Sequence, residues 1–178
     1  MLFRSLGKGR FEELTDQAGT AIQAAHNSRG CALGDFDNDG DLDVLVVNLN
    51  EPPSLLRNDV TGGNSWLKVK LIGTKSNRSG IGARLRCVTH SAGETKPHAQ
   101  IDEVRSGGGY FSQNDLRVHF GIGKAEKVDL LEIRWPSGLV EKVENIKPNQ
   151  VIYVKEGQGI VRTMQFPEGK ASARRKSQ

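Results

Sequence analysis

The sequence predicts an all-β protein in which a small blade-like β unit precedes a six- to seven-stranded β-sandwich or barrel. Residues from Trp66 onward alternate apolar and charged side chains with a period of two, as half-buried strands do. Glycine is abundant, with 21 in 178 residues, and no segment sustains the 3.6-residue period of a helix. Short apolar runs flank an acidic loop near the start, which indicates a strand-loop-strand unit.

The alternating segments define the strands of the larger domain. Leu67, Val69 and Leu71 alternate with Lys68 and Lys70. Six or seven strands between residues 65 and 157 are enough for a sandwich or barrel that shields its own edges. The same alternation places further strands at residues 83–87, 116–120, 131–135, 139–143 and 151–154.

The first 60 residues contain an internal echo. Leu2-Phe-Arg-Ser5 recurs as Leu55-Leu-Arg-Asn58, and a period near 50 residues is the size of a propeller blade. Chance is the alternative for so short an echo. A lone blade has no neighbour on which to bury its face. We expect a blade-like unit at 1–60 with a short helical turn near 16–25, a β domain at 61–160, and a basic, disordered tail at 161–178.

The net charge of +4 argues against nucleic acid as a partner because of where it lies. Residues 162–178 carry the whole excess of Lys and Arg, so the rest of the chain is neutral. A basic tail is not a binding face. No apolar stretch approaches the ~20 residues of a membrane span, so no membrane partner is expected.

The two cysteines are too few for a disulfide framework. Cys87 lies on the apolar side of a predicted strand, and Cys31 precedes the apolar pair Ala32-Leu33. We expect buried free thiols, because a free cysteine behaves as a small hydrophobe. A Cys31–Cys87 bridge is the alternative.

The acidic loop Asp35-Phe-Asp37-Asn-Asp39-Gly40-Asp41-Leu-Asp43 predicts a cation site. Five carboxylates in nine residues repel one another, and Ca2+ is bound by six to eight oxygens from carboxylates, carbonyls and water. Gly40 permits the sharp turn. The expected side-chain ligands are Asp35, Asp37, Asp39 and Asp43, with Asp41 offering its backbone carbonyl.

The flanking residues exclude a helix-loop-helix calcium hand. Such a hand needs helices on both sides and a bidentate Glu at position 12, where this chain has Val46 within the β-type run Val44–Val47. The loop therefore lies between two strands. Mg2+ is the alternative ion, although it retains more water and takes fewer protein ligands. A solvated acidic turn is the alternative without a metal.

These residues carry a family resemblance. The segment Gly34–Asp43, with Leu2–Phe11 before it and Leu55–Asn58 after it, resembles the FG-GAP/VCBS repeat of integrin-type β-propellers. The resemblance implies that the matching aspartates bind calcium in a β-hairpin loop. It also implies a propeller of several blades, of which this chain holds one blade-like unit, so the chain is expected to be the C-terminal end of a larger protein or a separately encoded remnant.

A second resemblance covers the larger domain. It looks like the ASPIC/UnbV domain, which typically follows an FG-GAP propeller and implies no agreed biochemical activity. The resemblance implies a secreted or extracytoplasmic location, while the first ten residues lack an apolar core of signal-peptide length, which leaves the cytoplasm open. The motifs that carry it are Ser76–Arg84, Glu103–Gln113, Asp115–Gly123 and Glu132–Gly138.

The chain shows no catalytic constellation, so we expect a non-catalytic module for structure or protein interaction. The four histidines lack metal-type spacing, and Gly121-Ile-Gly123-Lys124 lacks the remainder of a phosphate loop. The alternative is an enzyme or biosynthetic accessory protein with a ligand site at Gly107–Gln113. Its candidate groups would be Glu103, Arg105, Tyr110 and His119. An unknown protein, or a second copy paired through an exposed edge strand, is the expected partner.

Overall fold

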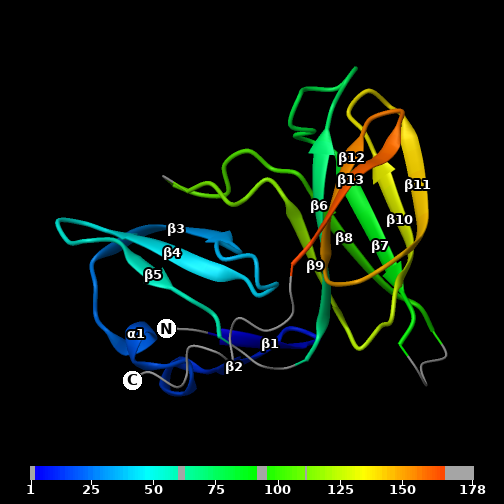
Figure 1. Ribbon diagram of the computed structural model, residues 1–178. Coiled ribbons are helices and arrows are strands. Elements are labelled where there is room, and N and C mark those ends of the chain that lie inside the picture. Colours follow the sequence, from blue (N-terminus) through cyan, green and yellow to red (C-terminus); the bar gives the residue numbers. More distant parts are fainter. Residues whose placement is uncertain (1–2, 60–62, 92–95, 111, 167–178) are drawn as a thin grey trace.

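The computed structural model describes residues 3–59, 63–91, 96–110 and 112–166. Within these ranges it contains thirteen β-strands and two short helical segments, which confirms the all-β prediction. The strands form two units on either side of residues 57–64. Figure 1 shows the smaller N-terminal unit alongside the larger one, next to β9 and β6.

The first unit combines a two-stranded hairpin with a three-stranded antiparallel sheet of order β3-β4-β5. The hairpin turns at Lys8, whose φ of 51° lies between two glycines that also have positive φ. Two short helical segments occupy the region where a helical turn was predicted. The elements are β1 (Phe3–Gly7), β2 (Arg10–Glu13), η1 (Thr15–Gln17), α1 (Thr20–Gln23), β3 (Ser28–Gly34), β4 (Asp43–Asn48) and β5 (Ser54–Leu56).

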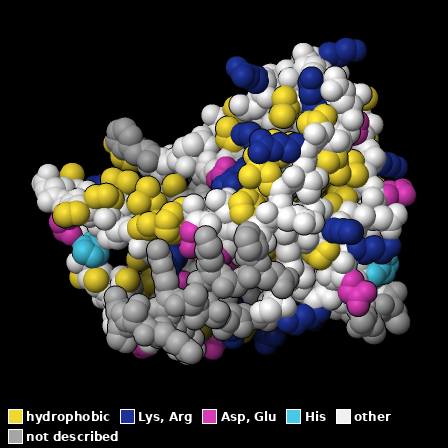
Figure 2. Space-filling model, viewed as in Figure 1, with side chains coloured by type: hydrophobic (Ala, Val, Ile, Leu, Met, Phe, Trp, Pro, Cys, Tyr) yellow, Lys and Arg dark blue, Asp and Glu magenta, His cyan; other side chains and the backbone are white. Residues whose placement is uncertain are grey.

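Both faces of this three-stranded sheet carry apolar side chains. Cross-strand partners point to one face, so Leu45 and its partner Leu55 share a face, while Leu33 and its partner Val44 share the other. Leu45 is 41% exposed, Leu55 50% and Leu33 40%. Figure 2 shows apolar side chains gathered over this unit. Within the described part of the chain, no layer buries these side chains.

The second unit is a β-sandwich of two four-stranded sheets, ordered β11-β10-β7-β8 and β13-β12-β6-β9. All pairings are antiparallel except that of β12 with β6. The strands are β6 (Ser65–Ile72), β7 (Arg84–Thr89), β8 (His98–Glu103), β9 (Val118–Gly123), β10 (Val128–Arg134), β11 (Val140–Ile146), β12 (Gln150–Lys155) and β13 (Gly159–Gln165).

The sandwich core lies between the two sheets and follows from the period-two pattern. Leu67, Val69 and Leu71 of β6 are fully buried against residues of the other sheet such as Leu85 and Leu131. Each such side chain stabilises the fold by about 1.5–3 kcal/mol relative to exposure. The alternate residues Trp66, Lys68 and Lys70 therefore point to the outer face of their sheet, which faces the first unit.

The strand prediction for residues 65–157 is confirmed, since β6–β12 supply seven strands there. One boundary differs. The predicted tail begins too early, because β13 extends past residue 161 to Gln165; residues 167–178 lie outside the described ranges. The expectation that both thiols are buried holds for Cys87 and is wrong for Cys31, which is exposed. Both cysteines are free, so the Cys31–Cys87 bridge does not form. The described residues contain no helix long and apolar enough to span a membrane.

Candidate functional site: the acidic loop and its contacts

The acidic loop connects β3 to β4, as the sequence predicted. Its first three aspartates converge: ligand oxygens of Asp35, Asp37 and Asp39 all lie within 4.8 Å of one another. Asp35 is buried, whereas the other two are exposed. Three carboxylates at this separation are a donor set suited to a hard divalent cation, so the residues present fit the predicted metal.

Asp35 also organises the loop backbone. Its Oδ1 accepts a hydrogen bond from the Asp39 amide at 3.1 Å, and its Oδ2 accepts one from the Gly40 amide at 2.8 Å. Asn38, which directly precedes Asp39 in this turn, has a positive φ of 60°. A carboxylate that receives two amides of the same turn holds that turn closed. Asp35 is therefore both a candidate ligand and the anchor of the loop.

Asp43 is placed differently from the first three aspartates. It is 2% exposed, and its two carboxylate oxygens accept hydrogen bonds from the Phe36 and Asn58 amides at 3.0 and 2.9 Å. Neither Asp43 nor Asp41 belongs to the converging group of the described residues. Asp43 therefore joins the start of the loop to the end of the first unit. The ligand roles of the Asp43 carboxylate and of the Asp41 carbonyl stay predictions.

Burial, followed by mutual repulsion, raises the pKa of two loop carboxyls. For Asp39, burial acts first, the hydrogen bond from the Asp41 amide opposes it, and the charges of Asp37 and Asp43 add to the increase. For Asp41, burial is again first, followed by the charge of Asp39. The loop thus concentrates negative charge that a nearby cation would stabilise.

The second unit contacts this loop directly. Gly40 packs on the indole of Trp66, so closely that an added Cβ would lie 1.9 Å from Trp66 Nε1. Gly40 has a φ of 103°, which an L side chain rarely adopts. The glycine that the sequence assigned to a sharp turn is therefore required for contact between the units as well.

Two basic side chains of the second unit reach the loop. The ammonium of Lys68 in β6 contacts Asp35 Oδ2, and the Arg117 guanidinium donates to Asn38 Oδ1 at 2.8 Å and to the Asp35 carbonyl at 3.2 Å. Asp115 holds Arg117 through a 2.5 Å ion pair. Burial, and then the charge of Arg117, lower the pKa of Lys68, while Asp115 and the contact with Asp35 favour its charged form.

His119 lies beside this contact. Its ring stacks on Trp66 with centroids 6.2 Å apart, and its buried Nδ1 has no hydrogen-bond partner in the described structure. Burial, followed by the charges of Lys68 and Arg117, lowers its pKa to about 4. A neutral imidazole packed in this way is suited to a structural role.

Residues 112–115, which begin within the predicted ligand loop Gly107–Gln113 and extend past it, connect the two units. The Cys31 amide of β3 donates to Ser112 Oγ at 3.1 Å, and the Leu33 amide donates to Asn114 Oδ1 at 3.0 Å. The Asp115 amide donates to the Leu33 carbonyl at 3.0 Å. This segment thus covers part of the free edge of β3.

Tyr110, one of the candidate groups for a ligand site at this loop, has a side chain that is 72% exposed; Phe111 lies outside the described residues. Of two further candidates for a ligand site at this loop, one is held in an ion pair and the other belongs to a strand of the sandwich. Arg105 pairs with Asp102 at 3.2 Å, and Glu103 lies in β8 opposite Arg84.

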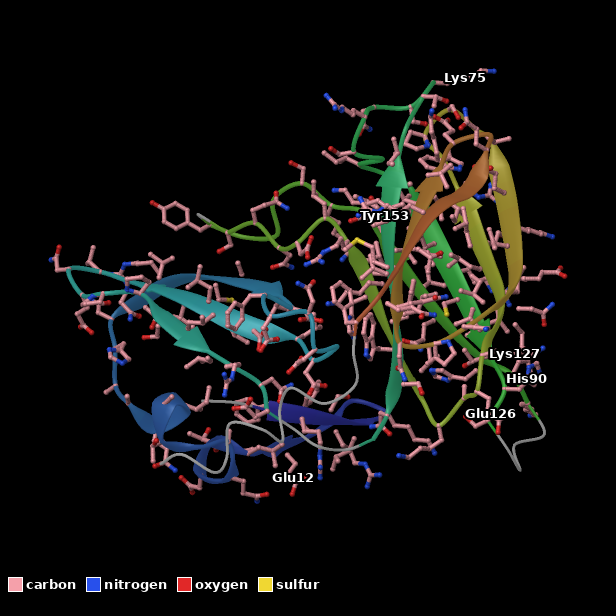
Figure 3. All side chains as sticks on the ribbon, in the orientation of Figure 1. Glu12, Lys75, His90, Glu126, Lys127 and Tyr153 are labelled. Carbon is pink, nitrogen blue, oxygen red and sulfur yellow. The ribbon has the colours of Figure 1, made fainter. Side chains whose placement is uncertain are left out.

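Sequence reasoning missed the buried carboxylate of Glu156. It lies at the end of the sandwich that carries Lys75, a residue labelled in Figure 3. One Glu156 oxygen accepts the amides of Thr74, Lys75 and Ser76 at 2.7–2.8 Å, and the other accepts the Ser76 and Ser137 hydroxyls at 2.8 and 2.5 Å. Glu156 therefore clamps two loops. Its partners lie up to 82 residues away, so no local motif could reveal it.

The protein is an all-β chain in which a hairpin unit with an aspartate-rich loop contacts a β-sandwich. Comparison with protein families gives the same organisation. The ASPIC and UnbV family matches residues 73–161, and the FG-GAP-like repeat matches residues 1–46. The chain belongs to the ASPIC and UnbV family, and an FG-GAP-like repeat precedes the ASPIC and UnbV domain. These matches confirm both resemblances.

Relatives include cartilage acidic protein 1 of Homo sapiens and of Mus musculus, each 28% identical over 142 residues, or 77% of this chain. Cartilage acidic protein 1 of Xenopus tropicalis is 30% identical over 125 residues, or 68% of this chain. The chain spans about a fifth of the length of these relatives, since the matches cover 18–21% of them.

Proposed function

We propose that this chain is a non-catalytic, calcium-binding β module that serves structure or protein interaction. The observation that carries the proposal is the convergence of the Asp35, Asp37 and Asp39 carboxylates within 4.8 Å in a strand-loop-strand hairpin. Calcium supplies positive charge and a flexible oxygen coordination shell there. Mg2+ is the weaker candidate, because it demands stricter octahedral geometry.

The proposed ion acts as a structural staple. Asp35 already closes the turn through the Asp39 and Gly40 amides, so an ion shared with Asp37 and Asp39 would tie the outer arm of the loop to this anchor. An ion that binds only the folded loop stabilises the fold in proportion to its concentration. The candidate groups for a reaction, His119 and Arg105, are engaged in stacking and in an ion pair, which supports a non-catalytic role.

We also propose that the first unit packs within a larger propeller-type assembly. A three-stranded sheet with exposed leucines on both faces, such as Leu33 on one and Leu45 on the other, is suited to lie between neighbouring sheets of its own kind. The relatives are about five times longer than the matched part, which leaves room for such neighbours. The similarity to these relatives supports, as part of this proposal, a location of the module outside the cytoplasm.

The test of the calcium proposal is thermal unfolding with added calcium and with chelator, on the wild type, Asp37→Asn and Asp16→Asn. Asp37 is exposed, so its amide variant changes the donor set with little effect on packing. Asp16 is an exposed acid of the same unit outside the loop and gives the matched control.

The wild type and Asp16→Asn should unfold at a higher temperature in calcium than in chelator. Asp37→Asn should lose most of that difference while keeping the wild-type Tm in chelator. A wild-type Tm that is the same in calcium and in chelator would refute the metal assignment. Repeating the titration with magnesium distinguishes the two ions, since the calcium response should appear at lower concentration.

A further inference from the structure

We propose that the β-sandwich supplies Lys68 and Arg117 as built-in positive charges that hold the acidic loop docked without a metal and weaken its affinity for calcium. This inference rests on the proposed calcium site. It assigns to the second unit the control of the calcium affinity of that site. Lys68 and Arg117 belong to the sandwich, whereas the loop belongs to the first unit, so the binding site would be set by the contact between the two.

The burial of Lys68 is the first observation. Lys68 is 1% exposed and is the one lysine among the buried residues that the structure describes. An unpaired ammonium in such a place is strongly unfavourable, so it persists when a carboxylate compensates it. Asp35, itself 1% exposed, is the carboxylate that its ammonium contacts.

The use of the Asp35 oxygens is the second observation. Oδ2 receives both the Lys68 ammonium and the Gly40 amide, and Oδ1 receives the Asp39 amide. A carboxylate has about four lone-pair positions, so three are occupied before any metal arrives. A cation bound by Asp35, Asp37 and Asp39 must share Asp35 with Lys68 and accept a positive neighbour.

Arg117 reinforces the same arrangement through other atoms of the loop. Its guanidinium donates to Asn38 Oδ1 and to the Asp35 carbonyl, and the Asp115 carboxylate orients it. Arg117 thus fixes the loop backbone to the sandwich at the point where the loop turns. Two fixed charges near the metal position oppose a divalent cation by Coulomb repulsion, which is substantial at a partly buried site.

The test is a calcium titration by calorimetry on the wild type, Lys68→Met, Arg117→Gln and the control Lys70→Met. Lys70 lies two residues further along β6 on the same outer face and is half-buried, so it reports the effect of removing a lysine from that face. Lys68→Met should bind calcium about tenfold more tightly, Arg117→Gln several-fold more tightly, and Lys70→Met within twofold of the wild type. Arg117→Gln decides the question if Lys68→Met does not fold.

An unchanged or weaker calcium affinity in the folded variants would overturn the proposal. The docking role is read separately, from the Tm in chelator of Asp35→Asn and Asp37→Asn. Asp35→Asn should lower that Tm because it leaves Lys68 buried without its counter-charge, and Asp37→Asn should not. If the wild type binds no calcium, the proposed function and the control of affinity fail together. The docking role then stands if Asp35→Asn lowers the Tm in chelator and falls if it does not.

Discussion

The ammonium of Lys68 in β6 contacts the carboxylate of Asp35 at the start of the acidic loop, and both side chains are buried. This ion pair joins residues 33 positions apart in the chain and connects the two units of the protein. It places the candidate metal site at their junction. Around it, Trp66 packs on Gly40 and Arg117 binds the loop backbone, so the loop and the sandwich face form one continuous contact.

Gly40→Ala should destabilise the contact between the units. A methyl group at Gly40 would overlap the Trp66 indole, with its Cβ 1.9 Å from Nε1, and overpacking of this kind costs about 1–3 kcal/mol. Gly138→Ala is the matched control, because Gly138 has a similar positive φ of 91° but no atom within 4 Å of the added carbon. Chemical denaturation should show the larger loss for Gly40→Ala; equal losses would mean that backbone strain alone acts.

Glu156→Gln should weaken the end of the sandwich that lies away from the acidic loop. Burial raises the pKa of Glu156, but hydrogen bonds from Ser137, Ser76 and Thr74 outweigh it and hold the pKa far below the ordinary 4.5. The carboxylate therefore contributes stability that is fully present above pH 4.5 and is lost as pH falls through the folded-state pKa. Thermal unfolding at neutral pH should give a lower Tm for Glu156→Gln.

Glu126→Gln, at an exposed acid labelled in Figure 3, should leave the Tm unchanged. The Tm difference between the wild type and Glu156→Gln should shrink as pH falls below 4.5, because the carboxyl then binds a proton in the unfolded state while the folded state keeps its charge. A difference that is constant with pH would show that the charge of Glu156 is irrelevant to the clamp.

His119 should make the protein sensitive to mild acid. Its pKa falls from 6.5 to about 4 in the folded state, first through burial and then through the charges of Lys68 and Arg117. The folded state thus binds fewer protons than the unfolded state, so stability is full above pH 6.5 and declines as pH falls towards 4. The loss should reach roughly 1–3 kcal/mol.

The measurement is the pH dependence of the unfolding free energy for the wild type and His119→Phe. The variant should show a shallower decline between pH 6.5 and 4, while the control His98→Phe, at an exposed histidine of β8, should follow the wild type. Parallel curves for all three proteins would mean that His119 is solvated and titrates normally.

The exposed leucines of the first unit should drive self-association of this chain. Leu45 and Leu55 are cross-strand partners on one face, and a contiguous apolar face favours association. The double substitution Leu45→Lys and Leu55→Lys should lower the average molecular mass measured by light scattering at high protein concentration. It should change the Tm little. Ile101→Lys, at a residue of β8 that is 66% exposed, is the control; the same effect from it would place the contact elsewhere.

Local pattern predicted most of the fold because β-strands with one buried face have a period that a sequence displays directly. The alternation of Leu67, Val69 and Leu71 with Lys68 and Lys70 gave β6 its register. The strand β13 escaped because Gly159–Gln165 is largely exposed and shows no clear alternation. The first unit has exposed apolar residues on both sheet faces, so periodicity gave no sign that Cys31 is exposed.

The candidate site was predictable only in part. The spacing of Asp35, Asp37 and Asp39 was enough to bring their carboxylates together, since these residues lie in one short loop. The partners from the sandwich were not predictable: Lys68 reads as one of two equivalent lysines on a polar strand face, and Arg117 as a surface residue. Contacts between units depend on tertiary placement, which leaves no local mark in the sequence.

The calcium proposal assigns one ion to the three converging aspartates of the acidic loop. Isothermal titration of calcium into the chelator-treated protein and into Asp37→Asn measures this binding. We expect one calcium bound per wild-type chain and an affinity at least about tenfold weaker in the variant, because the variant lacks one charged ligand. The absence of binding heat from the wild type, with a probe such as terbium luminescence also showing no binding, would contradict the calcium proposal.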